Sequence, residues 1–479
     1  MATSGSGFSQ MFANVHGEGH PYIWYILLRT AYAFFGVPQV LPVLAWLVGA
    51  AIVTLLVLRS PFGLLALIGI LFSRLVLYEF SVMARNYGIG MLLILIAAAI
   101  YERCRDRGYW LGLVLALVAN TNIMAVFPAG AFLVFWVLDL VLRDGLRWSP
   151  AIRNFLINSL IVGAGVIVCA FTVYPTFNDA ATANSHVDVY MVLKMLALLG
   201  VSLGEPHILI WALVVGALLG LLRHPAQFVS LLMAVFGTSA LVLLLRGDYR
   251  HSSGILFYTI AMYWTALARE KAGYTLSEAS QFPCLIRWAS GKWVGLVVSL
   301  GRWSFLLLLL LDVSHGASIL GDEVLRKHAY SQVGKFGRFV EQHPEYKDAT
   351  VIADPDFLVE ALPYWINNPS YLIREHVYRK YVIFTTHARL DISLDEVRET
   401  AEQLAAKSGK PVVILIGAPL ADVHTPEKIQ EGYDWILRVD PQQIARFNAT
   451  TRLIGSFRPA PSTHEEFDAY LYSSTAKAR

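Results

Sequence analysis

Charged and polar side chains that could form a site for a phosphate group lie between two long apolar runs of this 479-residue chain. They are Arg74, Glu79, Arg85, Asn86 and Tyr87. An ionisable residue at membrane depth is costly and therefore points to function. Arginine suits phosphate because its guanidinium donates two parallel hydrogen bonds. We predict a phosphate-binding site here; the structural alternative is an ion pair of Glu79 with Arg74 or Arg85 that joins two helices.

Three further polar groups flank apolar segments. Glu18 and His20 precede an aromatic run that begins at Pro21, where polar chemistry would meet lipid; a tail that leads into a helix is the alternative. Arg250 and His251 end a short predicted loop that begins at Arg246, and a solvated loop with an internal Asp–Arg pair is the alternative. The run 120–122 is predicted to end one helix and cap the next turn.

Composition and motifs argue against several other function classes. The net charge of +3 gives no indication of a nucleic-acid partner. Among the 13 histidines His16 and His20 have HxxxH spacing, but no cysteine accompanies them, and the three cysteines lie in or near the apolar part, so we predict no metal site built from histidine and cysteine. The sequence has no glycine-rich phosphate loop after a predicted strand and no GxSxG elbow.

The apolar residues are concentrated in blocks long enough for a membrane. Hydrophobic residues make up 56% of the chain and charged residues only 15%, against about 25% charged in ordinary soluble domains. A bilayer core needs roughly 20 apolar residues per helix. The blocks predict an all-α polytopic membrane domain over 1–315 with about ten transmembrane helices, followed by a small α/β domain over 316–479. The predicted spans are 40–58, 62–82, 88–102, 109–124, 128–142, 155–175, 207–222, 227–245, 254–268 and 293–313.

Segment 21–36 is shorter than a span. At 1.5 Å per residue it would reach about 24 Å, less than the ~30 Å hydrocarbon core. It is also rich in tyrosine and tryptophan and carries Arg29. We predict a helix that lies in the membrane interface; a crossing helix, which would put the N-terminus in the cytoplasm, is the alternative.

Basic residues predict the orientation. They are concentrated in the loops 102–108, 143–153 and 269–292, whereas the alternate loops hold few. The positive-inside rule makes the basic loops cytoplasmic. Residues 315–479 and the Glu18–His20 run are then predicted outside the cytoplasm, in a multi-pass protein of a bacterial inner membrane.

The last third of the chain predicts an α/β layer. Short β-branched runs at Thr350–Asp354, Tyr381–Thr385 and Pro411–Ile416 indicate strands. Ser393 and Glu396 are spaced as a capping box ahead of a helix that extends to Lys407. A strand–helix–strand order of this kind favours a parallel sheet.

Two motifs resemble a known superfamily. The segment from Glu18 to Gly36, with His-Pro and an aromatic run, resembles the His-Pro element of GT-C membrane glycosyltransferases. That group includes protein O-mannosyltransferases and the lipid A aminoarabinose transferases. The run 78–90 looks like the outer arginine–tyrosine stretch of a bacterial branch.

The resemblance implies transfer of a sugar from a polyprenyl-phosphate carrier to a glycan, lipid or protein acceptor outside the membrane. It makes Glu18 the first candidate for the base that activates the acceptor, with Glu79 in reserve. Arg85 or Arg250 would neutralise the departing phosphate, with His20, Asn86, Tyr87 and His251 as further binding residues. It also allows a divalent cation as cofactor.

One departure from the superfamily bears on activity. Its members carry an Asp-Glu or Asp-Asp pair after a first transmembrane helix, ahead of the His-Pro element, but residues 1–16 contain no acid. The resemblance therefore implies either a start truncated relative to its relatives or a relative without the catalytic base. The rival hypothesis is a non-catalytic envelope scaffold or a lipid-linked glycan transporter.

Overall fold

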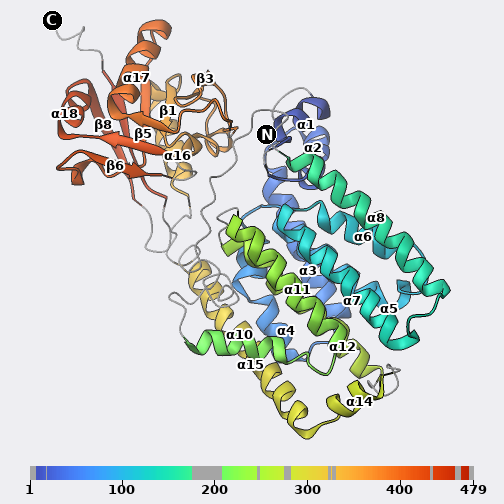
Figure 1. Ribbon diagram of the computed structural model, residues 1–479. Helices are drawn as coiled ribbons and strands as arrows, with labels where there is room; N and C mark the ends of the chain where they lie inside the picture. Colours follow the sequence, from blue (N-terminus) through green and yellow to red (C-terminus); the bar gives the residue numbers. More distant parts are fainter. Residues whose placement is uncertain are drawn as a thin grey trace, which may run out of the picture. The chain divides into compact units, whose positions relative to one another are not determined.

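The computed structural model describes residues 7–17, 19–174, 208–244, 249–274, 282–321, 325, 331–383, 385–431, 435–458 and 465–473. These residues fall into two compact units, a helical unit that extends to Ile319 and an α/β unit that begins at Leu320 (Figure 1). The helices of the first unit are α1 (Phe8–Val15), α2 (Ile23–Phe35), α3 (Val40–Arg59), α4 (Leu64–Leu71), α5 (Tyr87–Cys104), α6 (Trp110–Ala119), α7 (Val126–Asp144), α8 (Pro150–Val173), α10 (Ile208–Leu219), α11 (Pro225–Leu244), α12 (Tyr249–Lys271), α14 (Pro283–Ala289) and α15 (Lys292–Leu320).

Five helical segments among the described residues are long and apolar enough to cross a membrane. They are Val40–Arg59, Tyr87–Cys104, Ile123–Asp144, Pro150–Val173 and Lys292–Leu320. Their outward side chains include Leu160 and Ile167, which are 75% and 71% exposed, as expected for a surface that contacts lipid. The chain is therefore a mostly helical membrane protein. Ten spans remain a prediction.

The predicted span 62–82 is interrupted. Helix α4 ends at Leu71, and a π-helical turn, η1 (Leu75–Glu79), follows it. The hydroxyl of Ser73 donates to the carbonyl of Ile70 at 2.7 Å, which competes with the helical hydrogen bonds at this point. A continuous helix over 62–82 is therefore a wrong prediction.

Helix α2 contains 13 residues and ends at Phe35. The next residue, Gly36, caps the helix in the left-handed conformation, with a φ of 66°. At 1.5 Å per residue its length is about 20 Å, still short of a span. Trp24 and Leu28 pack against Ala45 of α3 and Ile89 of α5. An interfacial position for this helix remains a prediction.

Loops with many basic residues meet at one end of the helical unit, which we call the basic end (residues 102–108, 143–153, 269–274 and 282–292). The guanidinium of Arg143 donates to Asp106 at 2.6 Å, and that of Arg269 donates to Glu102 at 2.6 Å. The loops that the sequence analysis grouped by their basic residues alone therefore also lie together in the structure. Helix α5, about 27 Å long at 1.5 Å per residue, separates this end from Arg85 and Asn86.

A buried carboxylate ties three helices at the basic end. Asp139 of α7 accepts hydrogen bonds from the hydroxyl of Tyr101 on α5 at 2.7 Å and from Arg269 on α12 at 2.5 and 2.6 Å. Asp139 is 6% exposed. The charge of Arg269 therefore compensates a carboxylate that burial alone would disfavour.

The α/β unit contains two sheets. The larger has the strand order β3-β2-β1-β5-β9-β8 and the smaller β4-β7-β6. The strands are β1 (Thr350–Asp354), β2 (Ser370–Leu372), β3 (Val377–Tyr378), β4 (Asp391–Ser393), β5 (Val412–Ile416), β6 (Glu427–Gln430), β7 (Ile436–Val439), β8 (Thr451–Phe457) and β9 (Phe467–Tyr472). Strands β2, β1 and β5 are parallel, and β9 pairs antiparallel with β5. The sheet is therefore mixed, with the predicted parallel part at its centre.

Helices cover both faces of the larger sheet. Val351 and Ala353 of β1 share a core cluster with α16 (Val333–Gln342), whereas Ile352 joins Leu394 and Val397 of α17 (Leu394–Ser408). This alternation is the period of two that places successive strand residues on opposite faces. The predicted capping box at Ser393 and Glu396 is confirmed.

One predicted strand is wrong. Within residues 379–383 the structure has no strand, and the backbone N–H of Val382 donates instead to a carboxylate oxygen of Glu360 at 3.0 Å. Val382 is buried in the core cluster of α16. Its side chain thus contributes to the core from a loop, which explains its strand-like composition.

Candidate functional site

The structure places Glu79 against Arg74. Arg74 precedes the π-helical turn, Glu79 ends it, and the Nη2 of Arg74 lies 3.2 Å from the Oε1 of Glu79. The side chain of Glu79 is 3% exposed and that of Arg74 25%. Of the two partners that the sequence allows for Glu79, the structure therefore shows Arg74.

Arg85 and its neighbours connect this turn to α5. Arg85 is exposed, whereas Asn86 and Tyr87 are buried. The Nδ2 of Asn86 donates to the carbonyl of Thr121 at 2.7 Å. The bond fixes the start of α5 to the end of α6 and so positions Arg85 at the end of the helical unit opposite the basic end.

The run 120–122 has the capping role predicted for it. Asn120 follows the last residue of α6, and its Nδ2 donates to the carbonyls of Ala116 and Gly165. The Oδ1 of Asn122 accepts from the backbone N–H of Ala125 at 3.0 Å. The bonds to Ala116 and Ala125 satisfy backbone groups that helix ends leave open, and the bond to Gly165 joins the end of α6 to α8.

The N-terminal segment packs against the end of α8. The N–H of Gly17 donates to the carbonyl of Thr172 at 3.0 Å, and His16 lies 3.1 Å from the hydroxyl of Tyr22. His20 is half-buried, and Glu18 lies outside the described residues. A catalytic role for either residue remains a prediction.

Arg250 and His251 belong to a helix and not to the predicted loop. Helix α12 begins at Tyr249, and residues 245–248, which include Arg246, lie outside the described part of the chain. The predicted start at residue 254 was the start of the apolar block. The helix begins five residues earlier because the polar residues 249–253 are helical as well. The side chains of Arg250 and His251 are likewise outside the described set.

The starts of α5 and α12 lie at the same end of the helical unit. Phe80, beside η1, and Phe257, two turns into α12, have ring centroids 6.4 Å apart. A Cβ on Gly254 of α12 would lie 3.7 Å from Pro128 of α7. The structure thus brings together the elements that carry Glu79, Arg85 and Arg250, although it does not describe contacts between their side chains.

The α/β unit contains a buried charge cluster that the sequence analysis missed. Arg374 is 1% exposed, and its Nη2 donates to Asp354 at 2.8 Å and to Glu431 at 3.1 Å. Its Nη1 donates to the carbonyls of Arg389 and Leu390. Asp356 accepts the backbone N–H groups of Ile373 and Arg374. The signal in the sequence that could have indicated this cluster was the motif Asp-Pro-Asp, which begins at the last residue of the buried strand β1.

Burial raises the pKa of all three acids. The pKa of Glu431 is raised to about 8, by burial first and by the nearby charge of Asp354 second, while Arg374 opposes both. Burial raises the pKa of Asp356 to about 7, although the backbone N–H groups of Ile373 and Arg374 donate to its carboxylate and act to lower that pKa. Burial also raises the pKa of Asp354. One guanidinium serves these acids, so the folded unit holds protons that the unfolded chain would release at neutral pH.

We expect the stability of the α/β unit to fall as pH rises. The folded state binds more protons than the unfolded state, so the contribution is complete below the unfolded pKa of about 4 and is lost as pH rises through 7 to 8. Hydrogen exchange of β1 and β5 in the full chain at pH 6 and pH 9 measures this, after correction for the intrinsic exchange rate. Glu431→Gln, which imitates the protonated acid, should reduce the pH dependence. Equal protection at both pH values in the wild type would contradict the expectation.

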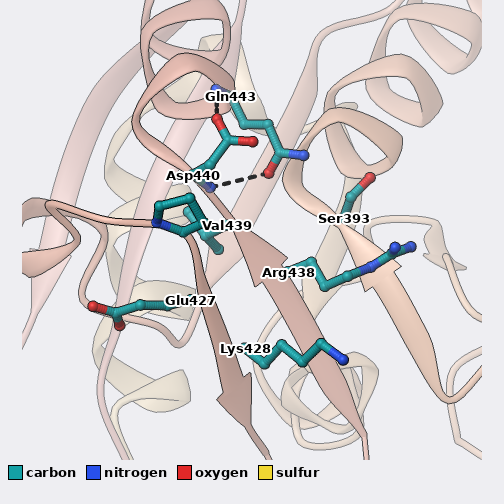
Figure 2. Close-up of a pocket in the computed structure, with 8 residues that line it drawn as sticks. Ser393, Glu427, Lys428, Arg438, Val439, Asp440 and Gln443 are labelled. Carbon is teal, nitrogen blue, oxygen red and sulfur yellow. Dashed lines mark hydrogen bonds between the residues drawn. The ribbon is translucent and has the colours of Figure 1, made fainter.

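An open pocket of about 450 Å³ lies where α17 and α18 (Pro441–Thr450) begin. Figure 2 shows Ser393, Lys428, Arg438, Asp440 and Gln443 around it. The helix amides are already satisfied, because Ser393 and Asp440 each cap their own helix in a capping box. Arg438 pairs with Asp391 at 2.7 Å. The pocket is polar and of mixed charge, and none of its lining residues is an aromatic on which a sugar ring could stack.

Among the described residues, no group of three His, Cys, Asp or Glu side chains could hold a metal ion. The cation allowed by the superfamily resemblance therefore has no described ligand set.

Comparison with solved structures finds a similarity that extends over almost the whole chain. The crystal structure of ArnT from Cupriavidus metallidurans bound to undecaprenyl phosphate matches 96% of this chain and 91% of its own, with 11% sequence identity and a TM-score of 0.46. No protein-family description matches the sequence, and no curated protein matches it. No residue of this chain takes a role from the similarity.

Proposed function

We propose that this chain transfers a sugar from a polyprenyl-phosphate carrier to an acceptor on the outer side of the membrane. The observation that carries the proposal is the clustering of Arg74, Glu79 and Arg85 in one short connection between apolar helices. This connection lies at the end of the unit that charge counting assigns to the outside. The His-Pro-aromatic motif at His20 supports the same reaction.

In this reaction the bond between the sugar's anomeric carbon and the carrier phosphate breaks as the acceptor oxygen bonds to that carbon. The acceptor proton passes to a base, and the phosphate leaves with increased negative charge. Exposed Arg85 would stabilise that charge, together with Arg250, His251 and His20. Asn86 would hold Arg85 in place through Thr121, and Tyr87 would complete the wall of the site.

Two carboxylates are candidates for the base. Glu18 is the first on sequence grounds, and Glu79 is the second. Since Glu79 already binds Arg74, its charge would also hold that guanidinium in position for phosphate. The same pair favours a second candidate function, a non-catalytic scaffold or lipid-linked glycan transporter, because an ion pair between turns can be purely structural.

We expect Arg85→Ala to lower sugar transfer by about 100-fold or more, because loss of one charge-stabilising donor typically costs that much. The assay supplies the purified full chain with labelled polyprenyl-phosphate sugars and an envelope extract. Arg147→Ala removes an arginine of the basic end and should retain full activity. Equal transfer by Arg85→Ala and wild type would remove Arg85 from the site, and no transfer by wild type would favour the scaffold.

A further inference from the structure

A groove at the basic end of the helical unit runs along the start of α15. It has a volume of about 310 Å³, and the residues that matter here are Arg223, Val298, Ser299, Arg302, Trp303 and Leu306. Arg223 follows α10, and the others lie on α15. None of them belongs to the predicted transfer site, which lies at the opposite end of the unit.

Glycines explain how closely α10 approaches α15. A Cβ on Gly301 would collide with the backbone of Gly216 and Gly220, so these helices touch at backbone level. Nearer the start of α15, the Nη2 of Arg223 lies 2.6 Å from the place of a Cβ on Gly295. The absent side chain thus leaves space that admits this guanidinium to the groove.

The groove carries more positive than negative charge. Arg302 donates from Nη1 to Glu270 at 3.0 Å and also from Nη2, and Glu270 lies 2.7 Å from His224. Arg223 donates only to the carbonyl of Ala289 among the bonds described for it. The groove thus has two guanidiniums, and the one carboxylate described beside it, that of Glu270, binds only Arg302 of the two. The Nε of Arg302 is buried without a partner in the described structure.

The polarity changes along one turn of α15. Trp303 follows Arg302 and is 65% exposed, and Leu306 begins a run of six leucines that extends to Leu311. Arg302 binds Glu270 near the end of α12, so this level of α15 lies at the basic end. Tryptophan is enriched at membrane interfaces and the leucines are suited to hydrocarbon, so a lipid contact here would place the first part of the predicted span 293–313 on the headgroup side. Arg302, Trp303 and Leu306 line the groove together, so it offers a charged contact and an apolar contact within little more than one helical turn.

We propose that this groove binds the headgroup of an anionic phospholipid from the leaflet at the basic end. Arg223 and Arg302 bind the phosphodiester, the hydroxyl of Ser299 can donate to the headgroup, and Trp303 and Leu306 contact the first part of an acyl chain. A free phosphate would use the arginines but not the apolar wall, which is why the lipid fits the groove better.

Native mass spectrometry of the full chain in detergent tests the proposal. Phosphatidylglycerol and phosphatidylcholine with identical acyl chains are compared, and we expect wild type to retain the anionic lipid about tenfold better. Arg223→Gln should bring that ratio close to one, and Trp303→Ala should weaken retention of both lipids. Arg59→Gln, a matched loss of charge at the end of α3, should leave the ratio unchanged.

Three results would overturn the assignment. The first is an unchanged lipid preference in Arg223→Gln when its thermal unfolding matches wild type. The second is an equal loss of preference in Arg59→Gln, which would indicate general charge attraction. The third is displacement of the lipid by deacylated glycerophosphoglycerol at equal concentration, which would identify a soluble phosphate as the ligand.

Discussion

Replacement of Arg374 by methionine is expected to destabilise the α/β unit by about 3–5 kcal/mol, the cost of removing one partner from a buried ion pair. Its side chain is wholly buried between Asp354 and Glu431. Its guanidinium also lies 4.8 Å from the ring centroid of Trp435. Methionine fills part of the volume but leaves two carboxyl groups without a cation and two carbonyls without a donor. A domain is typically stable by only 5–15 kcal/mol, so the loss is a large fraction.

Hydrogen exchange of β1 and β5 peptides in the full chain measures this loss without separating the units. Arg438→Met is the matched control, because Arg438 is half exposed and forms a surface pair with Asp391. Such pairs contribute about 0–1 kcal/mol, so its protection should be close to wild type. Unchanged protection in Arg374→Met would show that the buried cluster contributes little to the fold.

Asp139→Asn is expected to have the second large effect, a loss of about 3 kcal/mol in the helical unit. The substitution keeps the shape of the side chain but leaves Arg269, whose side chain is 11% exposed, without its closest counter-charge. It also replaces one of the carboxylate oxygens, which accept hydrogen bonds from Tyr101 and Arg269, with an NH2 group that can only donate. Thermal unfolding of the purified protein in detergent gives the measurement.

Asp106→Asn makes the same chemical change at a carboxylate that is 48% exposed and should shift the unfolding temperature little. If the two variants unfold at the same temperature as wild type, Asp139 does not tie the helices energetically.

The sequence predicted structure well where one property dominated a long segment. The apolar block at 40–58 corresponds to α3 within one residue at its end, and β1 has the predicted bounds. It failed where local polar competition decides the backbone, as at Ser73 and the π-helical turn. It also failed at Val382, because burial in a loop leaves the same composition as burial in a strand.

Candidate site residues show the same division. The run 74–87 was recognisable because charges are rare in apolar surroundings, but the choice of Arg74 over Arg85 as partner of Glu79 depends on the π-helical turn. Arg374 was not recognisable, since its partners Asp354 and Glu431 lie 20 and 57 residues away in the chain. Periodicity does not indicate which distant strands will meet.

The carboxylate of Asp139 has a mechanical consequence for substrate entry. It joins α5, α7 and α12 at the basic end through charged hydrogen bonds, whereas the contact described between Phe80 and Phe257 at the other end is aromatic only. We therefore expect these helices to separate more easily at the Arg85 end. If the chain transfers sugar as proposed, a bulky carrier lipid would enter at that end, where a small tilt gives the largest displacement. Spin labels near the starts of α5 and α12 should therefore show a broader distance distribution than labels near their C-terminal ends, and Asp139→Asn should broaden the latter.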